Sequence, residues 1–166
     1  NHKAIRGEAQ ERHQTGSSNF MKVKQLAEAV LIDVPIQTEV THRYLLTPYL
    51  EEGKMLEALS AADVVVGRSG SGTLFEVASF GRPAILVPLE GSAKDHQKAN
   101  AYTFAGGGGA VVIEEENLSS QIFLHELKKI LGNPATEDAM SRAALQFAKP
   151  RAAEDIANQI LETAVK

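Results

Sequence analysis

The chain has 166 residues, about one ordinary domain, and 43% are apolar, which is typical of a globular protein with a core and excludes a disordered or collagen-like chain. Seventeen basic residues against 21 acidic ones give a net charge of −4, without the basic excess expected of a nucleic-acid-binding protein. The chain has no cysteine, which excludes disulfides, zinc–thiolate sites and cysteine nucleophiles, and no apolar run long enough to predict a transmembrane segment.

The first part of the chain is polar. We expect residues 1–12 to form a solvated end ahead of a folded domain at 13–166. The chain begins with Asn1 rather than Met and shows no signal peptide. We therefore expect an intracellular piece of a longer protein.

Three elements are expected before the middle of the chain. Apolar residues recur at helical spacing over 20–31, which predicts a helix, and Pro35 closes that segment. The segment 38–46 is rich in Thr, Val and Tyr and predicts a strand. Apolar residues between positions 55 and 59 indicate a short helix that follows a loop at Pro48.

A regular alternation follows. Short apolar runs at 64–66, 84–87 and 110–113 predict three buried strands. Helical patterns at 73–80 and 94–105 separate them. Continuous apolar strands joined by helices imply parallel pairing, covered on both faces. We therefore predict an α/β fold, a Rossmann-like three-layer parallel sheet with helices on both faces.

Three helices complete the chain. Ser119 or Ser120 is expected to cap the first, and Gly132 and Pro134 to end it. Acidic residues at 137–138 open the second, where the helix dipole favours negative charge, and Pro150 stops it. The third carries apolar residues at helical spacing over residues 153–164.

The loop at 68–72 links a predicted strand to a predicted helix and is rich in glycine and serine. Glycines let the backbone approach a ligand, and the free N–H groups of a first helical turn bind anions. The loop therefore suits a phosphate or diphosphate, with hydroxyls from Ser71 and Thr73 and charge from Arg68. It lacks the P-loop and dinucleotide signatures, and a plain strand-to-helix turn capped by serine remains an alternative.

Glu76 lies about 200° around the predicted helix from Leu74, at ~100° per residue, and should face away from the core. A carboxylate beside a bound nucleotide typically accepts hydrogen bonds from the ribose hydroxyls. Compensation of the helix dipole in the first turn is the alternative role.

A second stretch, 88–100, also follows a buried strand and supplies compact polar groups. Asp95, Gln97 and Asn100 suit sugar hydroxyls, although Asp95 could instead cap a helix. His96 by itself is more typical of a surface or capping residue than of a base. The five histidines show no metal-like spacing, so we predict no protein-bound metal.

Together these stretches resemble glycosyltransferase family 28, and within it the undecaprenyldiphospho-muramoylpentapeptide β-N-acetylglucosaminyltransferases. The resemblance runs from about His13 to the C-terminus, with five motifs in order at family-like spacing. The motifs are His13–Gly16, Pro48–Leu50, Ala62–Asp63 with Arg68–Glu76, Gly81–Pro88, and Asp95–Gln97 with Asn100–Ala101.

The resemblance implies the GT-B architecture, in which two Rossmann-like domains face each other across a cleft. The C-terminal domain holds the UDP-sugar donor and the N-terminal domain holds the lipid-linked acceptor. This chain would be the donor half without its first strand, with the acceptor domain absent. The general base would come from that absent domain, so no catalytic residue is assigned here.

The resemblance also implies residue roles. Leu50 would lie beside uracil through its backbone, and Glu76 would bind the ribose. The diphosphate would be lined by Ser71, Gly72 and Thr73, and the sugar by Gln97, with His96 and Asn100. Arg68 would order the loop or the nucleotide pocket.

The function implied is binding of UDP-N-acetylglucosamine for inverting transfer of its sugar to a muramoyl-pentapeptide lipid, as a substrate and without a cofactor. The whole protein would then be cytoplasmic and peripheral at the inner face of the plasma membrane. Two alternatives are a stand-alone donor subunit of a two-protein transferase and a non-catalytic nucleotide-sugar binding module.

Overall fold

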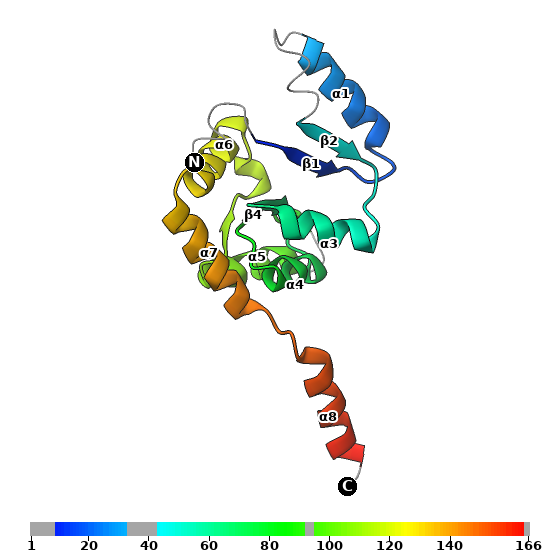
Figure 1. The fold of residues 1–166 in the computed structure, drawn as a ribbon, viewed down its shortest axis with the longest axis vertical. Coiled ribbons are helices and arrows are strands. Elements are labelled where there is room, and N and C mark those ends of the chain that lie inside the picture. The colour runs from blue at the N-terminus through cyan, green and yellow to red at the C-terminus, as the bar shows by residue number, and fades with distance from the viewer. Residues whose placement is uncertain (1–8, 33–42, 92–94, 165–166) are drawn as a thin grey trace. The chain divides into compact units, whose positions relative to one another are not determined.

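The computed structural model describes residues 9–32, 43–91 and 95–164 (Figure 1). The chain divides into two compact units, residues 1–62 and 63–166. Each unit has its own parallel sheet.

The first unit holds a two-stranded sheet and two helices. Strands β1 (Glu11–Gln14) and β2 (Tyr44–Thr47) pair in parallel, and helices α1 (Phe20–Ile32) and α3 (Glu52–Ala61) follow them in turn. Both helices confirm the predictions. The predicted strand at 38–46 is described only in its last part, because residues 33–42 lie outside the described ranges.

Strand β1 was not predicted. Its sequence, Glu-Arg-His-Gln, is polar throughout and shows neither β-branched residues nor alternation. It is defined by pairing: Glu11 faces Tyr44, Gln14 faces Thr47, and His13 Nδ1 lies 2.6 Å from the Tyr44 hydroxyl. A strand that depends on its partner in this way leaves little local signal.

The second unit is built on three parallel strands in the order β3–β4–β5, with helices on both faces (Figure 1). These strands are β3 (Val65–Gly67), β4 (Ala84–Leu86) and β5 (Ala110–Val112). The register places Ala84 beside Val65 and Ala110. The predicted parallel α/β arrangement is confirmed.

Burial differs among these strands. All three residues of β4 are buried, as predicted for a central strand. The expectation that 64–66 is a buried strand was wrong, since Val66 is 46% exposed. Among the described residues, β3 is an end strand of its sheet and pairs with β4 alone. Strand β5, at the other end, is also only partly buried.

The core lies around β4. Ile85 packs with Ile130 and Met140, which come from helices α6 (Ser120–Leu131) and α7 (Pro134–Phe147). Ser119 Oγ accepts a hydrogen bond from the Ile122 N–H, which confirms the predicted cap of α6.

Helix α7 begins earlier than predicted. Pro134 does not end α6 but is the first residue of α7, where its missing N–H costs nothing. The side chain of Asn133 caps this helix by accepting from the N–H groups of Ala135 and Thr136.

Three phenylalanines join α7 to helices α4 (Ser71–Ser79) and α5 (His96–Gly106). The glycine-rich loop at 68–72 leads into helix α4. Phe147 stacks on Phe75 of α4 at 5.6 Å between ring centroids and meets Phe104 of α5 edge-on at 4.8 Å. Phe104 is fully buried. Side chains therefore tie both site-bearing helices to α7.

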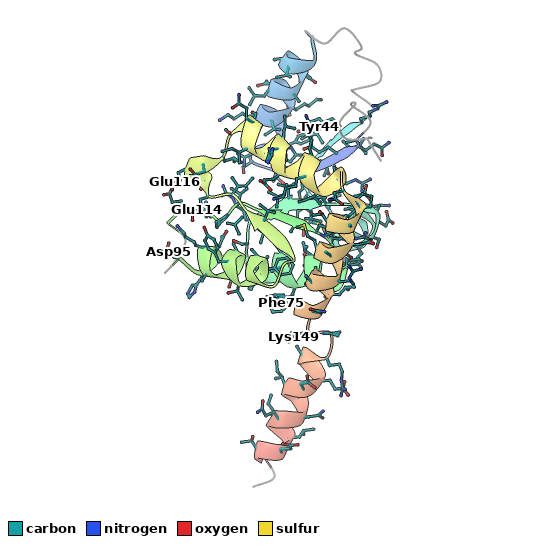
Figure 2. All side chains as sticks on the ribbon, turned by 90° about the vertical axis from the view of Figure 1, so that its left-hand side faces the viewer. Tyr44, Phe75, Asp95, Glu114, Glu116 and Lys149 are labelled. Atoms are coloured by element: carbon teal, nitrogen blue, oxygen red, sulfur yellow. The ribbon has the colours of Figure 1, made fainter. Side chains whose placement is uncertain are left out.

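Helix α8 (Ala152–Ala164) is exposed along its whole described length, and three of its apolar residues are more than half exposed: Ile156, Ile160 and Leu161. Among the described residues, no helix is both long and apolar enough to cross a membrane. Figure 2 shows the side chains over the ribbon.

Candidate functional site

The loop after β3 delivers the first turn of α4, which begins at Ser71, two residues earlier than predicted. Gly70 occupies the N-cap position and no side chain caps the turn, so the alternative of a serine-capped turn was wrong. The Leu74 N–H bonds to the Gly70 carbonyl, which leaves the N–H groups of residues 71–73 as the free donors of the helix start. These donors lie at the positive end of the helix dipole and form an anion-binding position.

The surface of this first turn is open. Ser71 and Gly72 are exposed and Thr73 is half-buried. A Cβ built on Gly72 meets no atom within 4 Å. The space beside the free N–H groups is therefore large enough for a ligand oxygen to approach the backbone.

Glu76 is exposed and Leu74 is buried, as predicted. Because the helix starts at Ser71, Glu76 lies in the second turn, and the first turn holds no acidic residue. The helix dipole acts within the first turn, which weakens dipole compensation as the role of this carboxylate.

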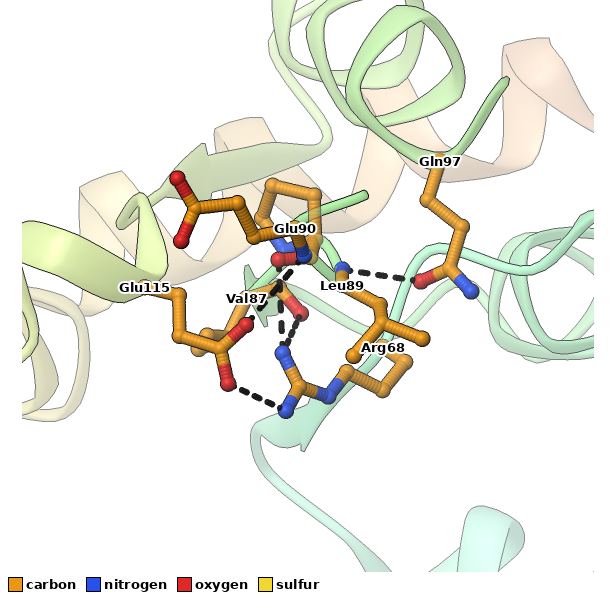
Figure 3. Close-up of polar contacts among 7 residues, drawn as sticks. Arg68, Val87, Leu89, Glu90, Gln97 and Glu115 are labelled. Carbon is orange, nitrogen blue, oxygen red and sulfur yellow. Dashed lines mark hydrogen bonds and ion pairs between the residues drawn. The ribbon is translucent and has the colours of Figure 1, made fainter. Parts of the chain in front are cut away.

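Arg68 contacts the loop after β4 and Glu115 (Figure 3). Its Nη1 donates to the carbonyls of Val87 and Pro88 at 3.2 and 3.3 Å, and its Nη2 donates to Glu115 at 2.8 Å. Of the two roles that the resemblance implied, these contacts favour ordering of the loop.

Gln97 and Asn100, both half-buried, extend from the first two turns of α5. Gln97 Oε1 accepts a 3.1 Å hydrogen bond from the Leu89 N–H, which leaves its amide nitrogen as a donor. Asn100 Nδ2 donates to the Ser69 carbonyl at 3.2 Å, and Ser69 Oγ donates to the Gln97 carbonyl at 2.6 Å. Hydrogen bonds thus join the two predicted binding segments.

The start of α5 has an unusual backbone. Asp95 stands at the N-cap position in the left-handed conformation, with φ 53°, and its side chain makes no capping hydrogen bond. Asp95 therefore occupies the N-cap position, as the alternative expected, but its side chain does not cap the helix. His96 is the first residue of the helix and its side chain is exposed.

Leu50 belongs to the first unit. Its N–H donates to Gln14 Oε1 at 2.8 Å, and its side chain is half-buried. The backbone N–H of Leu50 is therefore already bonded within the first unit.

A cavity of about 230 Å³ opens beyond β4 and β5. Its wall carries five carboxylates and one lysine: Glu90, Asp95, Glu114, Glu115, Glu116 and Lys98, together with Pro88 and Leu89. Such a wall repels a diphosphate but accepts hydrogen bonds from neutral hydroxyl groups. The anion position at α4 and this acidic cavity therefore suit different parts of a ligand.

Two of these glutamates are held ionised by their partners. Hydrogen bonds from Lys98 Nζ at 2.8 Å and from the Tyr102 hydroxyl at 2.5 Å lower the pKa of Glu114. The hydrogen bond from Arg68, and then that from the Glu90 N–H, lowers the pKa of Glu115. Within the described ranges, no group of three or more His, Asp or Glu side chains is arranged to hold a metal ion.

Sequence reasoning missed Ser69 and Glu115. Ser69 lies inside the recognised loop, but its burial and its bond to α5 have no local signal. Glu115 had a signal that was not used, because three consecutive glutamates, 114–116, follow a predicted strand at the ligand-binding edge of a parallel sheet.

Known proteins resemble this chain over most of its length. The family model described as "Glycosyltransferase family 28 C-terminal domain" matches residues 1–159. A UDP-N-acetylglucosamine--N-acetylmuramyl-(pentapeptide) pyrophosphoryl-undecaprenol N-acetylglucosamine transferase from Alkalilimnicola ehrlichii is 34% identical over 153 residues, which cover 92% of this chain and 40% of that protein. The protein of the same name from Caulobacter vibrioides is 41% identical over 106 residues, covering 64% of this chain and 29% of its own length.

The fold has solved counterparts. The crystal structure of Acinetobacter baumannii MurG superposes with a TM-score of 0.73 at 30% identity and covers 91% of this chain and 42% of that one. A glycotransferase of kitacinnamycin, at 21% identity and a TM-score of 0.63, shares the fold. The chain spans less than half the length of each of these proteins. On the match of the family model over almost its whole length, the chain belongs to glycosyltransferase family 28, as a C-terminal domain of that family.

Proposed function

We propose that this chain binds UDP-N-acetylglucosamine as the donor for inverting transfer of N-acetylglucosamine to a lipid-linked muramoyl-pentapeptide in peptidoglycan synthesis. The observation that carries the proposal is the uncapped, exposed first turn of α4. It offers backbone donors to a diphosphate, with the exposed carboxylate of Glu76 one turn further on. The names of the relatives from A. ehrlichii and C. vibrioides support this donor and this acceptor.

Each part of the donor has a matching group. The diphosphate takes the N–H groups and hydroxyls of residues 71–73, and the ribose takes Glu76. The resemblance to the family assigns uracil to the backbone of Leu50, which belongs to the first unit. The sugar takes the free amide nitrogen of Gln97, with His96, Asn100 and the acidic cavity beside them.

The reaction is a displacement at the anomeric carbon. The acceptor 4-hydroxyl forms the new bond while the bond to the β-phosphate oxygen of UDP breaks, with inversion of configuration. The charge that develops on UDP is stabilised by the free N–H groups of α4, which are already oriented before the reaction. Arg68 contributes by holding the loop through its contacts with Val87 and Glu115.

We propose that the donor-binding domain begins with strand β1 at Glu11, inside the end expected at 1–12, and runs to residue 166. We infer from the resemblance to the family that the acceptor site and the general base belong to an N-terminal domain, which this chain does not include. The protein would then act at the inner face of the plasma membrane as a peripheral enzyme, where its lipid-linked substrate lies.

Titration calorimetry tests the proposal. The chain is titrated with UDP-N-acetylglucosamine, UDP-galactose and ADP-glucose, and the titrations are repeated on Glu76→Ala. We expect uridine-selective binding that Glu76→Ala weakens by about tenfold, the loss of a charged hydrogen-bond acceptor. Glu162→Ala, an exposed glutamate on α8, is the matched control and should bind like the parent chain. A folded chain that binds none of the three nucleotide sugars would refute the proposal.

A further inference from the structure

Glu115 lines the acidic cavity and also lies at a junction between two loops. It begins the short 3-10 helix η3 (Glu115–Asn117) directly after β5. Its two carboxylate oxygens have different partners: Oε1 accepts from Arg68 Nη2 at 2.8 Å, and Oε2 accepts from the Glu90 N–H at 3.2 Å (Figure 3). One side chain therefore bridges the glycine-rich loop and the loop after β4.

The Arg68 side of the junction also acts on the loop after β4. The Val87 N–H continues the sheet ladder to the Gly67 carbonyl, and Pro88, which has no N–H, interrupts it. Arg68 Nη1 donates hydrogen bonds to the carbonyls of Val87 and Pro88 and so holds the chain where the ladder stops. The planar guanidinium, with donors in a fixed fork, reaches these carbonyls and Glu115 together.

The loop after β4 orients the side-chain amide of Gln97. The Leu89 N–H, between the carbonyl of Pro88 and the N–H of Glu90, donates to Gln97 Oε1. This bond fixes which end of the Gln97 amide faces the loop and which end is free. A displacement of residues 88–90 would release the amide from that orientation.

We propose that Glu115 is a positioning residue of the donor site: its carboxylate fixes residues 88–90, which hold the Gln97 amide with its nitrogen directed toward the donor sugar. This inference rests on the proposed function. Arg68 and Glu115 are 46% and 38% exposed, and pairs so exposed contribute little to the free energy of unfolding. Positioning therefore predicts a loss of affinity that is not accompanied by a loss of global stability.

The first measurement needs no ligand. Amide hydrogen exchange of Leu89 and Glu90 is followed by NMR in the full chain and in Glu115→Ala. We expect both amides to exchange about tenfold faster or more in the variant. The Glu90 N–H loses its acceptor, and the bond from the Leu89 N–H to Gln97 loses the neighbouring contact that holds the loop in place. Glu57→Ala is the matched control: Glu57 has an exposed 2.8 Å ion pair with Lys54 within helix α3, its pKa is also lowered by that partner, and it bridges no loops. Unchanged exchange in Glu115→Ala would overturn the proposal.

The second measurement separates positioning from general weakening. In Glu115→Ala we expect UDP-N-acetylglucosamine to bind about three- to tenfold more weakly, while UDP, which lacks the sugar, binds within about twofold of the parent chain. Gln97→Ala should show the same selective loss. The double variant should be no weaker than Gln97→Ala alone, because Glu115 acts through Gln97. Glu115→Gln, which keeps one acceptor oxygen, should fall between the parent chain and Glu115→Ala.

The failures are distinguishable. A parent chain that binds no uridine nucleotide refutes the proposed function, and the positioning role with it. A parent chain that binds, together with a Glu115→Ala that binds equally well, overturns the positioning role alone. Equal losses for UDP and the sugar nucleotide, or additive losses in the double variant, also overturn it.

Discussion

The hydroxyl of Ser69 donates a 2.6 Å hydrogen bond to the main-chain carbonyl of Gln97, from a side chain that is fully buried. Asn100 completes the link in the other direction by donating to the Ser69 carbonyl. The glycine-rich loop and the start of α5 are therefore one hydrogen-bonded assembly, and the two stretches that the sequence offered as separate binding segments depend on each other.

Ser69→Ala should lower the free energy of unfolding by about 1 kcal/mol, because it removes a buried hydrogen bond and leaves a small void. Urea denaturation measures the change. Ser79→Ala is the control, since Ser79 makes a similar 2.7 Å bond to the Phe75 carbonyl on an exposed helix face. That variant should stay within about 0.5 kcal/mol of the parent chain. If both variants lose the same free energy of unfolding, burial does not make the Ser69 hydrogen bond the more stabilising of the two.

Gly72→Ala should separate stability from binding. The added methyl has free space, and alanine favours a helix over glycine, so the free energy of unfolding should rise by about 0.5 kcal/mol. The same methyl occupies the approach to the free N–H groups of α4, so UDP affinity should fall by about tenfold or more.

Gly53→Ala is the matched control for that variant. Gly53 is the second residue of α3, as Gly72 is of α4, and a Cβ there also meets nothing within 4 Å. It should gain similar stability with no change in UDP affinity. If Gly72→Ala keeps full affinity for UDP, the diphosphate does not bind at the first turn of α4.

Gly81→Ala should be destabilising by about 2 kcal/mol. Gly81 has φ +59°, where a side chain is strained, and a Cβ would lie 2.8 Å from Leu145 Cγ. Thermal denaturation of the single variant and of Gly81→Ala with Leu145→Ala tests both causes. The second change should recover the steric part of the loss and leave the conformational part. A Gly81→Ala variant as stable as the parent would rule out both.

The stability of the chain should depend on pH through Glu137. Burial first, and then the negative charges of Asp63 and Asp138, raise the pKa of this carboxyl above its ordinary value of 4.5, against a smaller opposing effect of Arg82. The folded state then holds the proton more tightly than the unfolded chain, so this group's contribution to stability decreases as the pH rises from 4.5 through the raised pKa.

Glu137→Gln should therefore be more stable than the parent at pH 7, by a few tenths of a kcal/mol, and should lose that advantage below about pH 4. Urea denaturation across this pH range measures the difference. Asp138→Asn removes one of the charges that raise the pKa of Glu137. It should therefore narrow the pH range over which the contribution of Glu137 to stability changes. A constant difference between Glu137→Gln and the parent at every pH would contradict the assignment.

The sequence predicted those features that have a local physical cause. Ala84–Leu86 is a buried strand because it is apolar without interruption, and Ser119 caps a helix because its hydroxyl matches the free donors of the turn. The opposite orientation of Glu76 and Leu74 follows from helical geometry alone.

The features that were missed depend on distant partners. The polar strand at Glu11 exists through its pairing with Tyr44, and Arg68 meets Glu115 across 47 positions of sequence. The exposure of Val66 follows from the place of its strand at the end of a sheet, which an apolar run does not encode. Local pattern and composition contain none of this information.

The ring of Phe147 touches Phe75 and Phe104 at once, so its size and tilt must suit two helices together. A smaller ring or an aliphatic side chain at any of these three positions would have to be matched at the other two. In evolutionary terms the three sites form one unit, and we expect relatives that differ at one of them to carry compensating changes at the others.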